Sequence, residues 1–221
     1  MCSSDLIIFD FDGVLIESEY VSNVQIAEAL TALGHPTTVE QAIDNFVGLG
    51  GRDFLDAVSR WVGGPGPEGF HSARKAEDER VMREGLDAVV GAIDFVRTLP
   101  PAIARAIASS STTAWITRHL DHIGLRDAFA DHIYSGREHV TLGKPAPDVY
   151  LYAAAKIGAD IARTLIIEDS PVGARGAIAS GAYVIGLAAG RHCGVGHVDK
   201  LRAEGVHDVA HSFAEIADLI A

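Results

Sequence analysis

Cysteine is scarce in this sequence of 221 residues, which contains two, Cys2 and Cys193. Two cysteines so far apart in the chain cannot form a disulfide framework or a cysteine-rich zinc site. Disulfide frameworks belong mostly to secreted proteins, so the low cysteine count favours a reducing compartment. We therefore expect a cytoplasmic protein.

Long apolar runs are also absent. No stretch approaches the roughly 18 to 20 consecutive apolar residues that a membrane-spanning helix requires. Near the N-terminus, Asp5, Asp10 and Asp12 interrupt the region where a signal peptide needs continuous apolar sequence. The sequence therefore predicts neither a membrane anchor nor an export signal.

Positive charge is in short supply, because 18 Lys and Arg stand against 30 Asp and Glu, a formal net charge of −12. Such a field repels polyanions at long range, which argues against nucleic acid or an anionic membrane as a partner. A small phosphorylated metabolite remains compatible, since a local cation or metal ion overrides the field. No oligomeric state is predicted.

Short apolar runs alternate along the chain with longer segments of helical period, which is the pattern of a parallel sheet covered by helices. Five runs are too short for helices and predict buried strands. They are residues 6–9, 103–108, 132–134, 165–167 and 183–187. Helical stripes predict helices over residues 114–123, 149–157 and 213–220. The expected fold class is α/β, with a Rossmann-like parallel sheet.

The strand pattern disappears between residues 17 and 84, where all readable periodicity is helical. Thr38 and Gln41, for example, have the spacing of a capping box that begins a helix. We therefore expect an α-helical cap over residues 17–84, inserted into a catalytic core of residues 1–16 and 85–221.

Carboxylates and hydroxyls follow three of the predicted strands, at the edge where ligands of parallel sheets bind. These residues are Asp10 and Asp12, Ser109 to Thr112, and Glu168 and Asp169. Lys144 adds one cation in a separate Gly-Lys-Pro segment. Carboxylates beside a core are costly unless a cation or a chemical role offsets the cost. Helix capping does not explain all of these residues together, so they predict a functional site.

In these motifs the sequence resembles the haloacid dehalogenase superfamily, in the helical-cap subgroup that includes phosphoglycolate phosphatase, sugar phosphatases and β-phosphoglucomutase. The motifs are DFDGV at 10–14, ASSST at 108–112, GKPAPD at 143–148 and IIEDSPVGARGA at 166–177. The resemblance implies a Mg²⁺-dependent phosphatase that hydrolyses a small phosphorylated metabolite, a sugar or sugar-acid phosphate, through an aspartyl-phosphate.

The resemblance also implies roles for the acidic residues. Asp10 is the expected nucleophile, and Asp12 is expected to protonate the leaving oxygen and then activate water. A hard divalent cation with oxygen ligands must offset the repulsion between carboxylate and phosphate, and Mg²⁺ suits this role. Its expected ligands are Asp10, the backbone carbonyl of Asp12 and Asp169, with Glu168 as an additional ligand or a support behind the ligands.

Lys144 is expected to neutralise the nucleophile and a phosphoryl oxygen, while Ser109 and backbone N–H groups near Ser110 hold the other oxygens. For the side chains of Ser110, Ser111 and Thr112 we expect a role as N-caps of the following helix rather than as phosphate ligands. In the cap, Arg52 lies in a glycine-rich loop that resembles the substrate-specificity loop of the family, with a surface ion pair as its alternative. Lys75 is a weaker candidate in a highly charged helix.

Two other functions stay open. β-Phosphoglucomutase carries a histidine in its first cap helix, ten residues beyond the second aspartate of the first motif, where this sequence has Ser22. This difference favours hydrolysis over phosphomutase chemistry. A non-catalytic binding protein on the same fold is disfavoured because Asp10, Asp12 and Lys144 are all present.

Three further residues, His192, Cys193 and His197, are of metal-ligating types. Their spacing is irregular, they lie in a glycine-rich stretch, and no fourth ligand is evident. We therefore expect a surface loop there.

Overall fold

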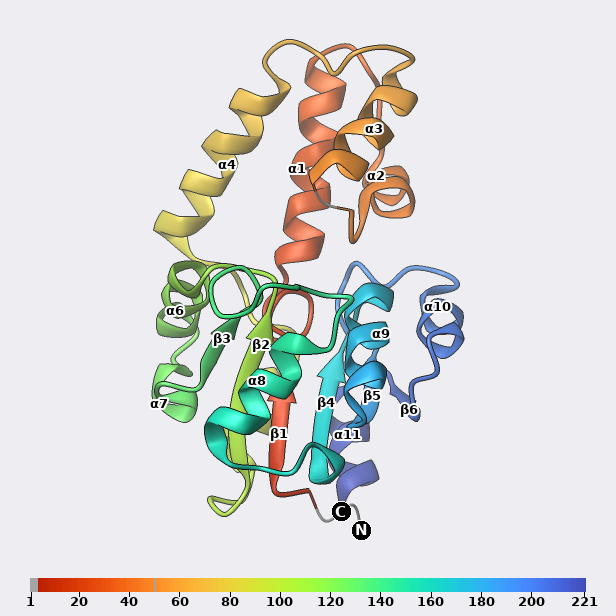
Figure 1. Cartoon of the computed structure of the whole chain (residues 1–221). Helices are drawn as coiled ribbons and strands as arrows, with labels where there is room; N and C mark the ends of the chain where they lie inside the picture. Colours follow the sequence, from red (N-terminus) through yellow and green to blue (C-terminus); the bar gives the residue numbers. More distant parts are fainter. Residues whose placement is uncertain (1–3, 50) are drawn as a thin grey trace. The chain divides into compact units, whose positions relative to one another are not determined.

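The computed structural model describes residues 4–49 and 51–221, so Cys2 lies outside the described residues (Figure 1). The chain divides into two compact units. Met1–Glu17 and Leu86–Ala221 form one unit, here named the core unit, and Ser18–Gly85 form the other, the cap unit. The divisions expected from the sequence, after residues 16 and 84, each lie one residue before these boundaries.

The core unit contains a six-stranded sheet with the strand order β3-β2-β1-β4-β5-β6. The strands are β1 Leu6–Phe9, β2 Ala104–Ser109, β3 Ile133–Ser135, β4 Thr164–Glu168, β5 Tyr183–Leu187 and β6 Asp208–Ala210. All neighbouring strands pair in parallel, which confirms the predicted α/β class and the Rossmann-like sheet. The sequence did not predict β6, because three residues beginning with an aspartate give no periodicity to read.

Helices cover both faces of the sheet. They are α5 Ala92–Thr98, α6 Thr113–His122, α7 Arg126–Phe129, α8 Asp148–Ile157, α9 Pro171–Ser180, α10 His197–Ala203 and α11 Phe213–Ile220, with a 3-10 turn at Ile161–Arg163. Leu6 and Ile8 of β1 pack in one cluster with Tyr150 of α8. Phe9 points to the other face, where its ring lies 6.1 Å from Phe95 of α5 and 5.6 Å from Phe129 of α7. This alternation buries β1 completely.

The cap unit contains helices joined by loops, and no strand lies among its described residues. Its helices are α1 Ser18–Ala32, α2 Val39–Phe46, α3 Gly51–Val62 and α4 Phe70–Glu84. The predicted capping box is confirmed at the start of α2, where the Gln41 N–H donates to Thr38 Oγ1 and the Thr38 N–H donates to Gln41 Oε1. Phe46 packs against Phe54 and Trp61, so this unit has an apolar core of its own.

Among residues 4–49 and 51–221, no helix is both long enough and apolar enough to cross a membrane.

Candidate active site

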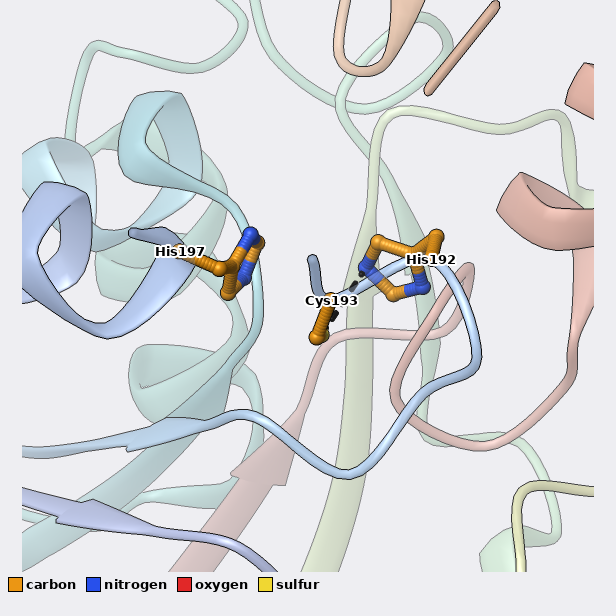
Figure 2. A group of neighbouring side chains, drawn as sticks. All are labelled: His192, Cys193 and His197. Carbon is orange, nitrogen blue, oxygen red and sulfur yellow. Dashed lines mark hydrogen bonds between the residues drawn. The ribbon is translucent and has the colours of Figure 1, made fainter. Parts of the chain in front are cut away.

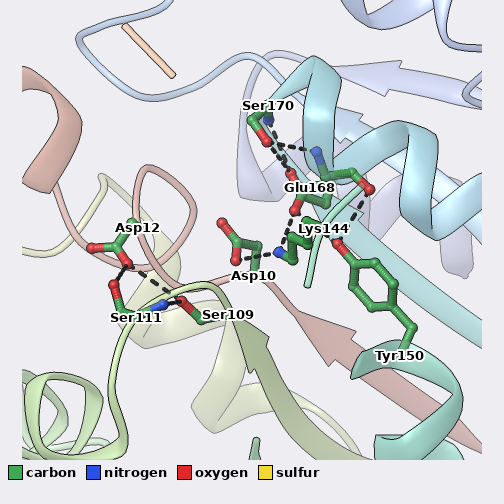
Figure 3. A network of polar contacts seen from close by, with 9 residues as sticks. Asp10, Asp12, Ser109, Ser111, Lys144, Tyr150, Glu168 and Ser170 are labelled. Carbon is green, nitrogen blue, oxygen red and sulfur yellow. Dashed lines mark hydrogen bonds and ion pairs between the residues drawn. The ribbon is translucent and has the colours of Figure 1, made fainter. Parts of the chain in front are cut away.

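The carboxyl ends of β1, β2 and β4 bring the predicted core residues to one edge of the sheet. Because β1 lies between β2 and β4, Asp10 at the end of β1 is flanked by Ser109 from β2 and Glu168 from β4 (Figure 3). The Asp10 N–H donates to the carbonyl of Ile167 at 2.9 Å, which continues the pairing of β1 with β4 by one residue. The sheet itself therefore sets the position of the Asp10 backbone.

Lys144 joins two of the carboxylates. Its Nζ lies 2.6 Å from Asp10 Oδ1 and 2.5 Å from Glu168 Oε1 (Figure 3). All three side chains are buried, with exposed fractions of 5%, 9% and 0%. Burial alone lowers the pKa of Lys144, but the two carboxylates outweigh it and raise that pKa well above its usual value. Lys144 is therefore a permanent cation that fixes the orientation of the Asp10 carboxylate.

Glu168 has hydrogen-bond donors on both carboxylate oxygens. Besides Lys144, Oε1 accepts from the Tyr150 hydroxyl at 2.9 Å, and Oε2 accepts from the Ser170 N–H and Oγ, each at 3.0 Å. Burial, and then the charge of Glu168, raise the pKa of Tyr150, so this hydroxyl stays protonated and donates. A Cβ at Gly173 would lie 1.8 Å from Oε1, so glycine is required beside the carboxylate. This geometry favours Glu168 as a support for Lys144.

Asp169 offers an oxygen to a cation. Its Oδ2 lies 2.8 Å from His192 Nε2, whereas its buried Oδ1 has no hydrogen-bond partner in the described part of the chain. Oxygen atoms of Asp10, Glu168 and Asp169 lie within 4.8 Å of one another. An unsatisfied buried carboxylate oxygen in a set of oxygen donors fits a hard divalent cation such as Mg²⁺.

The pKa shifts of the acidic residues also favour a divalent cation at this group of oxygen atoms. Burial raises the pKa of Asp10 well above its usual value, Lys144 opposes this, and Glu168 adds to it. Burial and then Glu168 raise the pKa of Asp169, again against Lys144. One lysine thus does not neutralise the group, and a divalent cation held by these oxygens would supply the missing positive charge.

Asp12 contacts residues between the end of β2 and the first turn of α6. Its Oδ2 accepts from Ser111 Oγ at 2.6 Å, with Ser109 Oγ at 3.4 Å, and its Oδ1 accepts from Trp115 Nε1 at 3.0 Å. Thr112 caps α6, as expected, by accepting from the Trp115 N–H. The Ser111 hydroxyl donates to Asp12, and the N-cap of α6 is Thr112. The prediction that Ser111 is an N-cap is therefore wrong.

The two serines predicted to hold phosphate differ in exposure. Ser109 is buried, and its Oγ accepts from the Ser111 N–H at 3.0 Å. Ser110 is exposed. Their phosphate-binding roles stay predictions.

The surface loop expected at residues 192–197 is wrong for its histidines. His192 and His197 are 1% and 6% exposed, and Cys193 Sγ lies 3.5 Å from His192 Nε2 (Figure 2). His197, the first residue of α10, donates from Nε2 to the Asp169 carbonyl at 2.7 Å. The glycine-rich sequence around these residues is typical of exposed loops. The histidines are buried because they contact Asp169, which is distant in sequence, and local composition does not indicate such contacts.

The two cap candidates lie on the exposed surface of the cap unit. Arg52 Nε is 3.9 Å from Asp56 Oδ2, and Lys75 Nζ is 3.9 Å from Glu79 Oε1. The Arg52 and Lys75 side chains are 92% and 80% exposed, so these pairs contribute little to stability. Gly50, part of the expected specificity loop, lies outside the described residues.

A parallel sheet that gathers carboxylates and a lysine at its carboxyl edge is typical of α/β enzymes that act on small ligands. Comparison with known proteins shows to which family of α/β enzymes the chain belongs. The family model of haloacid dehalogenase-like hydrolases matches residues 4–181, and the chain belongs to this family.

Individual relatives extend over nearly the whole chain. Hexitol phosphatase A of Escherichia coli K12 is 27% identical over 95% of this chain and 91% of its own length. A crystal structure of a haloacid dehalogenase-like protein of unknown function from Agrobacterium tumefaciens C58 has 31% identity and a TM-score of 0.89, covering 98% of this chain and 97% of that one.

Two further comparisons differ in coverage. A crystal structure of a hydrolase from Deinococcus radiodurans R1 with bound phosphate and sodium has 28% identity and a TM-score of 0.86, covering 100% of this chain and 96% of that one. The chloroplastic protein SUPPRESSOR OF QUENCHING 1 of Arabidopsis thaliana is 30% identical over 79% of this chain. This chain spans 17% of the length of that protein.

Proposed function

We propose that this protein is a Mg²⁺-dependent phosphatase that hydrolyses the phosphate monoester of a small sugar or sugar acid through an aspartyl-phosphate. The observation that carries the proposal is the placement of Asp10, whose carboxylate is held by buried Lys144 beside the unsatisfied oxygen of Asp169. The named activity of hexitol phosphatase A and the phosphate bound to the Deinococcus hydrolase support the same chemistry.

The reaction proceeds in two displacements. A carboxylate oxygen of Asp10 attacks phosphorus, the P–O bond to the substrate breaks, and Asp12 donates a proton to the leaving alkoxide oxygen. Asp12 then takes a proton from a water molecule that attacks phosphorus, which releases phosphate and regenerates Asp10. In the structure Ser111 and Trp115 hold the Asp12 carboxylate, so Asp12 must exchange at least one of these partners to reach the substrate.

Lys144 and the metal ligands offset the negative charge of the carboxylates and the phosphoryl group during these displacements. Lys144 holds Asp10 and is placed to neutralise a phosphoryl oxygen, and Glu168 keeps Lys144 in position. Asp10, Asp169 and the backbone carbonyl of Asp12 would hold the Mg²⁺, which, when bound, offsets repulsion between carboxylate and phosphate. Ser109 and the backbone N–H of Ser110 are proposed to bind the remaining phosphoryl oxygens.

Ser22 supports hydrolysis over phosphomutase chemistry. Its hydroxyl accepts from Arg74 at 3.0 Å, so it takes part in packing α1 against α4 within the cap unit. No imidazole is available at position 22 to accept or donate a proton when a second sugar hydroxyl enters the site. We therefore propose that water is the acceptor of the phosphoryl group.

The test is a Mg²⁺-dependent screen of sugar phosphates, sugar-acid phosphates, phosphoglycolate and nucleotides, ranked by kcat/KM. We expect phosphate release from sugar or sugar-acid phosphates, loss of release in EDTA, and none from Asp10→Asn, whose amide is a very poor nucleophile. β-Glucose 1-phosphate with a bisphosphate primer is included as a mutase substrate. Efficient formation of glucose 6-phosphate with little free phosphate would contradict hydrolysis, and inactivity toward every ester would favour a binding protein.

A further inference from the structure

We propose that His192 is a positioning residue for Asp169: it holds one carboxylate oxygen so that the other faces the divalent cation. This inference rests on the proposed role of Asp169 as a metal ligand. It assigns a function to a side chain that lies outside the four sequence motifs, on the loop between β5 and α10 (Figure 2).

The contact between the two side chains is direct and buried. His192 Nε2 lies 2.8 Å from Asp169 Oδ2, and the two side chains are 1% and 3% exposed. An ionised carboxylate oxygen can accept but not donate, so Nε2 carries the proton and donates it. Oδ2 is thereby occupied, and Oδ1, which has no hydrogen-bond partner among residues 4–49 and 51–221, is left as the oxygen for the cation.

Two glycines make the room for this imidazole. A Cβ at Gly13, where φ is +80°, would lie 2.0 Å from Asp169 Oδ2 and 2.9 Å from His192 Cε1. A Cβ at Gly190 would lie 2.5 Å from the same Cε1. The ring therefore fits closely between the loop after β1 and the loop after β5, and neither glycine can gain a side chain without displacing the ring or the carboxylate.

The loop that carries His192 is held at two further points. The Arg191 N–H donates to Glu17 Oε2 at 3.1 Å, which ties the loop to the segment after β1. His197 Nε2 donates to the Asp169 carbonyl at 2.7 Å. The two imidazoles thus hold the side chain and the backbone of Asp169 separately, with their rings perpendicular and 5.5 Å apart.

These bonds favour a supporting role over a second metal site formed by His192, Cys193 and His197. The Nε2 atoms of both histidines are engaged by Asp169, so a metal ion could bind either Nε2 atom only by breaking that atom's bond to Asp169. Burial, followed by the charge of Asp169, raises the pKa of the Cys193 thiol, which disfavours the thiolate that a metal requires.

The test measures metal binding without substrate, by Mn²⁺ titration followed by electron paramagnetic resonance. His192→Leu removes the donor and should weaken Mn²⁺ binding about 10- to 100-fold, the usual effect of losing a hydrogen bond behind a metal ligand. Glutamine places an amide nitrogen near the position of Nε2, so His192→Gln should bind Mn²⁺ within about threefold of wild type. His192→Asn, whose amide does not reach so far, should behave like the leucine variant.

Cys193→Ala is the matched control, since it alters the neighbour of the same ring but keeps the bond to Asp169. It should bind Mn²⁺ as wild type does. Equal Mn²⁺ affinity in wild type and His192→Leu, or in the Gln and Asn variants, would overturn the inference. A loss in Cys193→Ala as large as in His192→Leu would also overturn it, in favour of metal bound by the cluster itself. Comparing Gln with Asn keeps the test decisive if the leucine variant does not fold.

Kinetics separate this inference from the proposed function. The Mg²⁺ concentration for half-maximal activity should rise in His192→Leu by the same factor as the Mn²⁺ dissociation constant, while KM at saturating Mg²⁺ changes less than about twofold. An active wild-type phosphatase with unchanged metal affinity in His192→Leu would refute the inference alone. Weaker Mn²⁺ binding by His192→Leu, in a protein that hydrolyses no phosphate ester, would refute the proposed function and support the inference.

Discussion

Tyr150→Phe removes a single hydroxyl from the buried network that holds Glu168 and Lys144. Tyr150 is fully buried, and its hydroxyl lies 2.9 Å from Glu168 Oε1 and 3.2 Å from the Gly173 carbonyl. After the substitution Glu168 Oε1 keeps Lys144 but loses its second donor. The phenylalanine ring fills the same space, so the change isolates the hydrogen bond from packing.

The expected loss follows from the acceptor. A hydrogen bond to a charged group contributes about 1.5 to 3 kcal/mol. For a chain of this size each kcal/mol shifts the melting temperature by roughly 2 to 4 °C, so Tyr150→Phe should melt about 3 to 12 °C below wild type. If the loosened Glu168 displaces Lys144 in the transition state, 1.5 kcal/mol corresponds to roughly a tenfold lower kcat. KM should change little, because the hydroxyl does not touch substrate.

Thermal and urea denaturation followed by circular dichroism, together with steady-state kinetics, measure both effects. Tyr152→Phe is the matched control on the same helix, since its half-buried ring packs against Tyr134 at 5.5 Å and no hydrogen bond of its hydroxyl is found in the described structure. It should stay within about 0.5 kcal/mol of wild type. Equal stability and equal kcat in the two variants would refute the claim that Tyr150 supports the site.

Three further predictions concern the acid, the cap and the metal. Asp12→Ala should lower kcat by about 10² to 10⁴, the usual contribution of a general acid and base, and a normal rate would remove Asp12 from the mechanism. Arg52→Ala should raise KM more than it lowers kcat, because we propose that its exposed guanidinium binds substrate; an unchanged KM would leave it a surface ion pair with Asp56. The pKa values of the Asp10 and Asp169 carboxyl groups are raised in the folded protein above the unfolded value of 3.8. Folding therefore favours the protonated carboxyl groups. The stability that they contribute is fully present below pH 3.8 and is lost as the pH rises through the raised pKa values. Mg²⁺ opposes that loss, so the increase in melting temperature that Mg²⁺ produces should grow as the pH rises above 3.8; an increase that shrinks with rising pH would contradict the metal assignment.

The sequence predicted the parts of the site that follow from sheet topology. Asp10, Glu168 and Asp169 directly follow or end buried runs, and the carboxyl ends of neighbouring parallel strands must meet at one edge. Lys144 was identified by its motif, and the structure places its ammonium group between two of these carboxylates.

The supporting residues could not be read in the same way. Tyr150 lies on the apolar stripe of α8 and has the sequence pattern of an ordinary core residue, so its hydroxyl bond to Glu168 left no local signal. Trp115 likewise reads as one face of a helix, although its Nε1 reaches Asp12. His192 contacts Asp169 although the two residues are 23 positions apart in the chain, and such long-range pairing is set by the packing of loops rather than by periodicity.

The central claim, a covalent phosphoryl intermediate on Asp10, is tested most directly by trapping it. The enzyme is mixed with Mg²⁺ and its best substrate, quenched in acid, and treated with borohydride, which reduces an acyl phosphate of aspartate to homoserine. Peptide mass spectrometry then locates the homoserine. The mechanism predicts homoserine at position 10, dependent on substrate and Mg²⁺ and absent from Asp10→Asn. Homoserine at position 12, or rapid phosphate release with no homoserine at either position, would contradict it.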